Sequence, residues 1–178
     1  MRRIGQIDFE YLPDPPNSNG WQMGIENEAK QAPTFSSATD GPITGCLKIE
    51  SKGQYYADYD VDPSGRLCDV VALAIKVKTH ARIYLRIKVA SRNGQKSQHV
   101  WLAQSIGNRH PKRFNANEWE VFVSGEALDN GWTRLEISIP EQVEKTFGNE
   151  GWVYKELLGF RLRGSLSISP LTLLQSGR

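Results

Sequence analysis

The chain has 178 residues, of which 39% are hydrophobic and 24% charged, and its net charge is +2 at neutral pH. This length and composition suit a folded protein with a sizeable core. The 22 basic and 20 acidic residues nearly balance and are interleaved, so we expect no nucleic-acid partner. No apolar run approaches the length that spans a membrane, so we expect no membrane partner.

The start of the chain and its cysteines bear on the cellular compartment. The first residues, MRRIGQIDFEYL, lack the apolar core of a signal peptide. We therefore expect a cytoplasmic protein, unless the chain is a module excised from a secreted one. Cys46 and Cys68 have no metal-ligand spacing. Two buried free thiols are the simpler interpretation, and a disulfide between neighbouring strands is the alternative.

Alternation of apolar and polar residues predicts strands along most of the chain. Turn-forming clusters separate these strands: LPDPPNSNG, TDGP, DPSG, RNGQ, NAN and DNG. The residues expected to face the core are, in chain order, Val71, Leu73, Ile75, Val77, Ile83, Leu85, Ile87, Val89, Val100, Leu102, Trp119, Val121, Val123, Leu135, Ile137, Ile139, Phe160, Leu162, Leu166 and Ile168.

One segment favours a helix. PEQVEKTFG has Pro140 at its start and Gly148 as a stop, and WVYKELLG is expected to add at most a turn. The sequence therefore predicts an all-β chain: one antiparallel β-sandwich (jelly roll) domain over residues 1–178, with at most one or two short helical turns.

The strand RIYLRIKV, residues 82–89, raises the main functional question because its polar side places Tyr84 between arginines. If the strands that carry Trp101 and Arg161 belong to the same sheet, their outward side chains converge with Tyr84. The result would be an aromatic and guanidinium platform on an open face. The alternative is that these residues serve packing and solubility, since aromatic residues suit strands and arginines keep sheets soluble.

In the segment YYADYDVDPSG, alternation places three acidic side chains on one strand face together with a tyrosine. The residues of this face are Tyr56, Asp58, Asp60 and Asp62. Neighbouring carboxylates repel unless a cation neutralises them. The spacing is superficially that of a calcium loop, but Pro63 stands where such a loop needs glycine. We expect cross-strand pairing with Lys or Arg, for example Arg82 or Lys88.

The other tryptophans lie close to turns or strand ends. We expect Trp21 and Trp132, each in an NGW sequence, to plug the ends of the sandwich. Trp152 is the best candidate for a binding site formed by loops.

Several stretches, taken in order, resemble the carbohydrate-binding modules of the galactose-binding-domain-like jelly-roll type. They are DFEYLPDPPNSNGW, FSSATDGPITGCLKIES, YYADYDV, DVVALAIKVKTHARIYLRIKV, NEWEVFVSG, NGWTRLEISIP and GFRLRGSLSISPLTL. The resemblance implies a galactose-binding-like sandwich that binds glycans on the concave face of one sheet or in end loops. It also implies a structural calcium ion held by a first-strand glutamate, which Glu10 matches, and by a last-strand aspartate. The last strand here carries Ser165, Ser167 and Ser169 instead, which argues against the ion.

We therefore expect a non-catalytic module for an oligo- or polysaccharide, of the kind that is found as an appended domain in larger chains. The expected ligand-binding residues are Tyr84, Arg86, Trp101, His99, Arg161 and Arg163. One alternative is a protein-interaction or sensor β-sandwich module of a larger intracellular protein. The other is a small polysaccharide-cleaving enzyme that uses His99 and Tyr84 as proton movers beside Arg86.

Overall fold

The computed structural model describes residues 1–9, 21–25, 34–50, 55–77 and 81–177. Nearly all of the regular structure in these ranges is strand. The strands are β1 (Arg2–Ile7), β2 (Trp21–Ile25), β3 (Thr34–Asp40), β4 (Ile43–Glu50), β5 (Tyr55–Asp60), β6 (Val70–Val77), β7 (Arg82–Ser91), β8 (Ser97–Ile106), β9 (Lys112–Arg113), β10 (Glu118–Val123), β11 (Gly125–Ala127), β12 (Thr133–Ser138), β13 (Trp152–Arg163), β14 (Leu166–Ile168) and β15 (Leu171–Gln175). The helical elements are α1 (Ile139–Phe147) and the short 3-10 turns η2 (Pro63–Gly65), η3 (Asp129–Gly131) and η4 (Gly148–Glu150).

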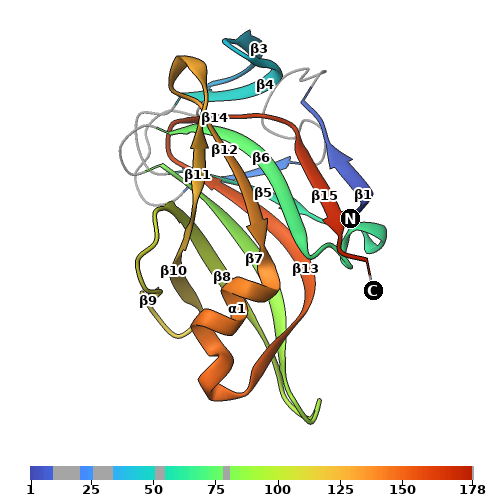
Figure 1. The fold of residues 1–178 in the computed structure, drawn as a ribbon. Helices are drawn as coiled ribbons and strands as arrows, with labels where there is room; N and C mark the ends of the chain where they lie inside the picture. Colours follow the sequence, from blue (N-terminus) through green and yellow to red (C-terminus); the bar gives the residue numbers. More distant parts are fainter. Residues whose placement is uncertain (10–20, 26–33, 51–54, 78–80, 178) are drawn as a thin grey trace.

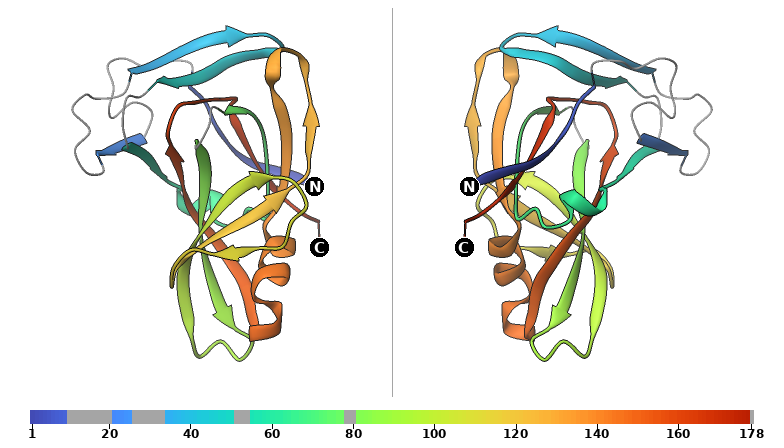
Figure 2. Two further views of the ribbon diagram at one scale, coloured as in Figure 1. Left: turned by 90° about the vertical axis from the view of Figure 1, so that its left-hand side faces the viewer. Right: turned by 90° about the vertical axis from the view of Figure 1, so that its right-hand side faces the viewer.

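The strands form two facing sheets (Figures 1 and 2), which confirms the predicted β-sandwich of the jelly-roll type. Sheet A has the order β1-β15-β6-β14-β4-β3. In this sheet β14 and β15 pair with successive parts of β6, β12 pairs with the opposite edge of β6, and β11 pairs with β12. Sheet B has the order β2-β5-β13-β7-β8-β10-β9. The described pairings are antiparallel except that β10 runs parallel to β8. The pair β3–β4 lies at one end of the sandwich, and α1 with the β7–β8 turn lies at the other.

The core lies between the two sheets and is built from the predicted inward residues. In β7, Ile83, Leu85 and Ile87 are each at most 1% exposed, as the alternation predicted. Trp119 is half-buried and packs against this core, so its predicted inward orientation is confirmed. Val77 is the exception, since its side chain is 44% exposed at the end of β6.

Two local predictions at the C-terminal part of the chain are wrong. The segment WVYKELLG forms the start of β13 and adds no helical turn. The alternating segment GFRLRGSLSI is not one strand, because the chain turns at Gly164 with a φ of 83°. Residues before this turn belong to β13 in sheet B, and residues after it form β14 in sheet A. Both halves still bury the predicted apolar residues, because each keeps its own alternation.

Helix α1 starts with Pro140 in its first turn and is followed by Gly148, as predicted. It lies over the lower part of sheet B (Figure 1), where Phe147 contacts Trp119 with ring centroids 5.1 Å apart. A buried pair of amides also joins the helix to β8. Gln104 donates to Gln142 over 3.0 Å, and Gln142 donates to Gln104 over 2.6 Å. Since both side chains are at most 7% exposed, each amide satisfies the other in place of water.

Replacing Gln142 by leucine is expected to lower the free energy of unfolding by about 1–3 kcal/mol, because Gln104 would keep a buried amide without its partner. The double variant Gln104→Leu/Gln142→Leu is expected to regain part of this loss. Urea unfolding of the wild type, both single variants and the double variant measures the coupling energy. Additive losses in the double variant would contradict the reciprocal pair.

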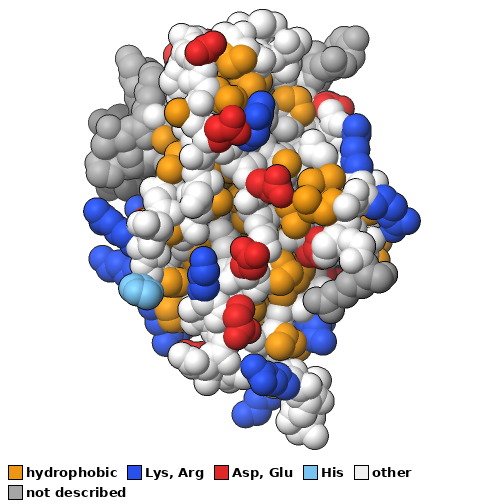
Figure 3. All heavy atoms as spheres, viewed as in Figure 1, with side chains coloured by type: hydrophobic (Ala, Val, Ile, Leu, Met, Phe, Trp, Pro, Cys, Tyr) orange, Lys and Arg blue, Asp and Glu red, His pale blue; other side chains and the backbone are white. Residues whose placement is uncertain are grey.

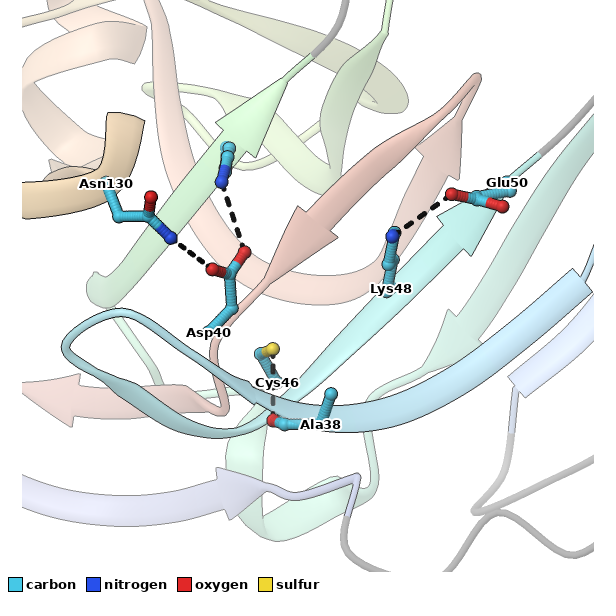
Figure 4. A network of polar contacts seen from close by, with 7 residues as sticks. Ala38, Asp40, Cys46, Lys48, Glu50 and Asn130 are labelled. Atoms are coloured by element: carbon cyan, nitrogen blue, oxygen red, sulfur yellow. Dashed lines mark hydrogen bonds and ion pairs between the residues drawn. The ribbon is translucent and has the colours of Figure 1, made fainter.

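A second, smaller core lies under the β3–β4 end of the molecule. Cys46, Ala74 and Trp132 are buried together there, apart from the main core. Beside them, the Asp40 carboxylate accepts a hydrogen bond from the Asn130 amide (Figure 4) and forms an ion pair of 3.2 Å with Lys76. Polar contacts and a buried indole therefore together hold this end of the sandwich.

The two cysteines are buried free thiols, as predicted, and the alternative of a disulfide between them is wrong. Burial raises the pKa of the Cys68 thiol to about 11, and burial also raises the pKa of Cys46. Within the described ranges, no helix is long and apolar enough to cross a membrane.

Candidate functional site

The predicted ligand-binding residues meet on the outer face of sheet B. The register pairs Arg86 of β7 with Trp101 of β8, and Lys88 with His99. On the other side of β7, the register pairs Tyr84 with Arg161 of β13. Directly opposed residues in an antiparallel pair share a sheet face. The strands that carry Trp101 and Arg161 therefore belong to the same sheet as the strand of Tyr84, in the order β13-β7-β8.

We call this surface the Trp101 face. Its members share the outer side of four adjacent strands, β5, β13, β7 and β8, and they are Tyr56, Asp58, Asp60, Glu156, Arg161, Arg163, Arg82, Tyr84, Arg86, Lys88, His99 and Trp101.

Trp101 is the centre of this face and is half-buried. The Arg161 guanidinium lies 4.2 Å from the Trp101 ring centroid, and the Arg86 guanidinium lies 5.8 Å from it. The ring of Tyr84 meets Trp101 edge to face, with centroids 6.3 Å apart and an interplanar angle of 85°. Two cations and one aromatic edge therefore hold the indole, and each is a favourable contact for its ring.

Arg161 links Trp101 to the acidic strand β5. Its Nε donates to Asp58 Oδ1 over 2.7 Å and its Nη2 donates to Asp58 Oδ2 over 2.9 Å. The same guanidinium lies 4.2 Å from the ring centroid of Tyr56. The Arg161 guanidinium thus contacts two aromatic rings. The two parallel hydrogen bonds to the Asp58 carboxylate fix its orientation, which is the bidentate geometry that guanidinium groups favour.

The predicted cross-strand pairing of the acidic strand with Lys or Arg is confirmed for Asp58, but its partner is Arg161 and not Arg82 or Lys88. Asp58 pairs with Arg161, whereas Arg82 instead forms an ion pair of 3.0 Å with Glu120 of β10. Asp62 does not share the strand face, because β5 ends at Asp60 and Asp62 caps η2. Its carboxylate accepts hydrogen bonds from Ser64 Oγ over 2.5 Å and from the Gly65 amide over 3.1 Å, and these bonds lower the pKa of the Asp62 carboxyl.

The prediction that the Tyr84 side chain is part of an open sheet face is wrong as regards its exposure to water. Its side chain is only 5% exposed, although it lies on the outer side of the sheet. The reason is that the Trp101 ring packs edge to face against the Tyr84 ring, and Arg161 is the residue directly opposite Tyr84 on the neighbouring strand. Tyr84 therefore forms the floor of the face.

The side-chain N–H donors beside Trp101 are those of Arg86, Lys88 and His99. His99 is exposed, and Arg86 and Lys88 are half-buried. No ion pair among the described residues engages these three side chains. Arg163 lies on the same face, in register with Arg82 and Tyr56. The hydrogen-bond donors available to a ligand are therefore concentrated beside Trp101 on β7 and β8.

The described residues do not fit the calcium ion that the resemblance implies. Glu10 lies outside the described residues. Ser169 is buried, and its hydroxyl accepts from the Ala74 amide over 2.7 Å and donates to the Pro170 carbonyl over 2.9 Å, so it is committed to the backbone. Within the described parts of the chain, no group of three or more His, Cys, Asp or Glu side chains is arranged to hold a metal ion.

The other tryptophans follow their predictions where the structure tests them. Trp21 and Trp132 are 2% and 1% exposed, so both are buried as expected. Trp152 is half-buried and lines a pocket at the start of β13, away from the Trp101 face.

The view from the side of sheet A (Figure 3) shows Lys and Arg side chains interspersed with Asp and Glu over that surface.

Sequence reasoning missed the roles of Tyr56 and Asp58 in the site. Their alternate positions in YYADYDV placed them together on one strand face, and that signal was visible. The sequence did not show which strand pairs with β5. The pairing of β5 with β13, which brings Asp58 opposite Arg161, joins residues 103 positions apart in the chain.

No family model and no curated protein matches the chain. Among solved structures, it is similar to the family 11 carbohydrate-binding module of the cellulosomal cellulase Lic26A-Cel5E of Clostridium thermocellum, with 11% identity and a TM-score of 0.45 over 98% of this chain and 97% of that one. A family 11 module of Clostridium thermocellum in complex with a β-1,3-1,4-mixed-linked tetrasaccharide shares 14% identity, with a TM-score of 0.44 over 95% of this chain and 93% of that one.

A loop-swap mutant of Xyn11A from Necallimastix patriciarum is also similar, with 10% identity and a TM-score of 0.35 over 86% of this chain and 92% of that one. The solved structures to which the chain is similar thus include carbohydrate-binding modules, the class that its sequence resembles.

Proposed function

We propose that this chain is a non-catalytic module that binds an oligo- or polysaccharide on the Trp101 face. The observation that carries the proposal is the half-buried indole of Trp101, held on an outer sheet face by contacts with the guanidinium groups of Arg86 and Arg161. A rigid aromatic group needs little ordering when a ligand binds, so it contributes contact area at low entropic cost.

The residues around Trp101 divide into two roles in this proposal. Arg86, Lys88 and His99 are the donors that contact sugar hydroxyl or carboxylate groups. Arg86 lies 5.8 Å from the centroid of the indole, Lys88 and His99 form the next outward register pair, and none of the three has an ion-pair partner among the described residues. Arg161 is a positioning residue, because Asp58 already takes two of its N–H groups. Arg163 contributes a further polar contact at the β5 side of the face.

Two observations favour binding over cleavage on this side of sheet B. A glycoside hydrolase uses two carboxyl groups across the scissile bond. Asp58 is held by Arg161, and Glu120 of the neighbouring strand β10 is held by Arg82 and by Ser105, whose hydroxyl donates over 2.7 Å. Asp60, Glu118 and Glu156 lie on the same side of the sheet, and the assay for new reducing ends tests them. A lyase built on His99 and Tyr84 would need a reachable phenol, and Tyr84 is buried under Trp101.

Replacing Trp101 by alanine is expected to weaken glycan binding by at least tenfold, because a central aromatic residue of a binding surface commonly contributes more than about 1.4 kcal/mol. The wild type is first screened on a glycan array of neutral and acidic oligosaccharides that includes a β-1,3-1,4-mixed-linked glucan. Calorimetry then compares wild type and variant on the best ligand.

Two matched variants complete the experiment. Trp101→Phe keeps a ring and is expected to retain part of the affinity. Arg134→Ala removes an exposed cation of sheet A, which pairs with exposed Glu126, and is expected to bind as the wild type does. The proposal fails if the wild type binds no glycan, or if folded Trp101→Ala binds with unchanged affinity. Release of new reducing or unsaturated ends from the ligand would overturn its non-catalytic part.

A further inference from the structure

A pocket of about 790 Å³ opens between α1, the first residues of β13 and the segment after β15. This volume lies within the range of about 300–1,000 Å³ typical of sites for small molecules. The lining residues that matter for its chemistry are Asp69, Glu144, Trp152, Tyr154, Lys155 and Ser176. The pocket is separate from the Trp101 face, because Trp152 and Tyr154 pack against the core between the sheets whereas Trp101 lies on the outer side of sheet B.

The walls of this pocket are fixed by hydrogen bonds. Asp69 accepts from the Ser176 amide over 2.8 Å and also from the Ser176 hydroxyl, which ties the end of the chain to the start of β6. The Ile139 amide donates to the Asp69 carbonyl over 2.9 Å, which ties the start of α1 to the same point. Arg2 donates to Gln175, the residue before Ser176, over 2.9 Å. The pocket is therefore preformed, which lowers the entropic cost of filling it.

Tyr154 belongs to this framework. Its hydroxyl donates to the Cys68 carbonyl, and burial raises the pKa of the phenol well above its usual range. The phenol thus stays protonated and committed to the backbone. It shapes the wall and leaves ligand contacts to other residues.

Three side chains of the lining are free for a ligand. Trp152 is half-buried and contributes the aromatic surface. Glu144 of α1 and Lys155 of β13 are exposed, and neither forms an ion pair within the described part of the chain. One aromatic surface, one carboxylate acceptor and one ammonium donor suit a small polyhydroxylated molecule, whose C–H surface packs on the ring while its hydroxyl groups bond at the edges.

We propose that this pocket, which we call the Trp152 pocket, is a second binding site for a monosaccharide or disaccharide. Trp152 contacts the sugar ring, Glu144 accepts from its hydroxyl groups, and Lys155 donates to its oxygens. The site acts independently of the Trp101 face, since the two lie on different surfaces of the molecule.

The test is an NMR titration that follows the indole Nε1–H signals of the five tryptophans. The probes are glucose, galactose, glucuronic acid and cellobiose, each raised to tens of millimolar. At least one probe is expected to shift the Trp152 signal saturably, while the buried Trp21 and Trp132 serve as internal references. A Trp152 signal that none of the four probes shifts would overturn the proposal.

Variants assign the response to the pocket without relying on Trp152, whose removal can disturb the core. Glu144→Gln and Lys155→Gln are each expected to weaken binding by fivefold or more, while Glu141→Gln on the same helix, outside the pocket, is expected to leave it unchanged. Equal affinities in all three variants would contradict the assigned contacts. Trp101→Ala is expected to retain the Trp152 response, so failure of one site is distinguishable from failure of the other.

Discussion

Replacing Arg161 by alanine is expected to weaken glycan binding by at least tenfold and to lower the free energy of unfolding by about 2 kcal/mol. The guanidinium is the common support of Trp101, Tyr56 and Asp58, with both ring centroids 4.2 Å away and two hydrogen bonds to the carboxylate. Its loss removes all of these contacts together. It also leaves Asp58 on the sheet face without the cation that pairs with it.

The expected stability loss is smaller than for a fully buried ion pair because water partly screens the charges. The side chains of Arg161 and Asp58 are 24% and 32% exposed. A buried pair that loses one member costs about 3–5 kcal/mol, whereas exposed pairs contribute about 0–1 kcal/mol. The intermediate exposure here, together with two cation–π contacts, leads to the value between these limits.

Arg161→Lys is the matched variant, because it keeps the positive charge and loses the planar, bidentate fork. If Arg161 acts by positioning, the lysine variant is expected to recover most of the stability and little of the glycan affinity. Urea unfolding and calorimetry measure the two quantities, and an Asp58→Asn variant tests the other side of the pair. Wild-type affinity in folded Arg161→Ala would show that the indole of Trp101 needs no such support.

The secondary structure and the layer arrangement followed from local patterns in the sequence. Alternation in 82–89 predicted the inward residues Ile83, Leu85 and Ile87 because side chains of a strand point alternately to its two sides. The helix between Pro140 and Gly148 followed from its start and stop residues. These features depend on neighbours in the chain, so a single sequence contains them.

The candidate site depended on contacts that the sequence alone does not specify. The outward position of Tyr84 was predictable, but its burial depends on Trp101, which a different strand supplies. The partner of Asp58 depends on which strand lies beside β5, and that strand follows 92 or more residues later in the chain. Alternation predicts the face of a residue, whereas strand order decides what that residue touches.

Replacing Trp132 by alanine is expected to lower the free energy of unfolding by about 3–5 kcal/mol, the usual cost of removing a large buried aromatic side chain. Trp132 is 1% exposed and is the largest member of the small core that it forms with Cys46 and Ala74. The segment before Trp132 is also fixed to β3, because Asn130, which has a φ of 63°, donates a hydrogen bond to Asp40 (Figure 4).

Trp132→Phe is the matched control, because the Nε1 of Trp132 is buried and has no hydrogen-bond partner among the described residues. The phenylalanine variant therefore loses no hydrogen bond and is expected to cost less than half as much as alanine. Urea unfolding measures both variants, and a loss below about 1 kcal/mol in the alanine variant would contradict the small core. Because this core lies apart from sheet B, the folded alanine variant is expected to bind glycan within twofold of the wild type. A larger change in affinity would show that the β3–β4 end of the molecule and the Trp101 face are coupled.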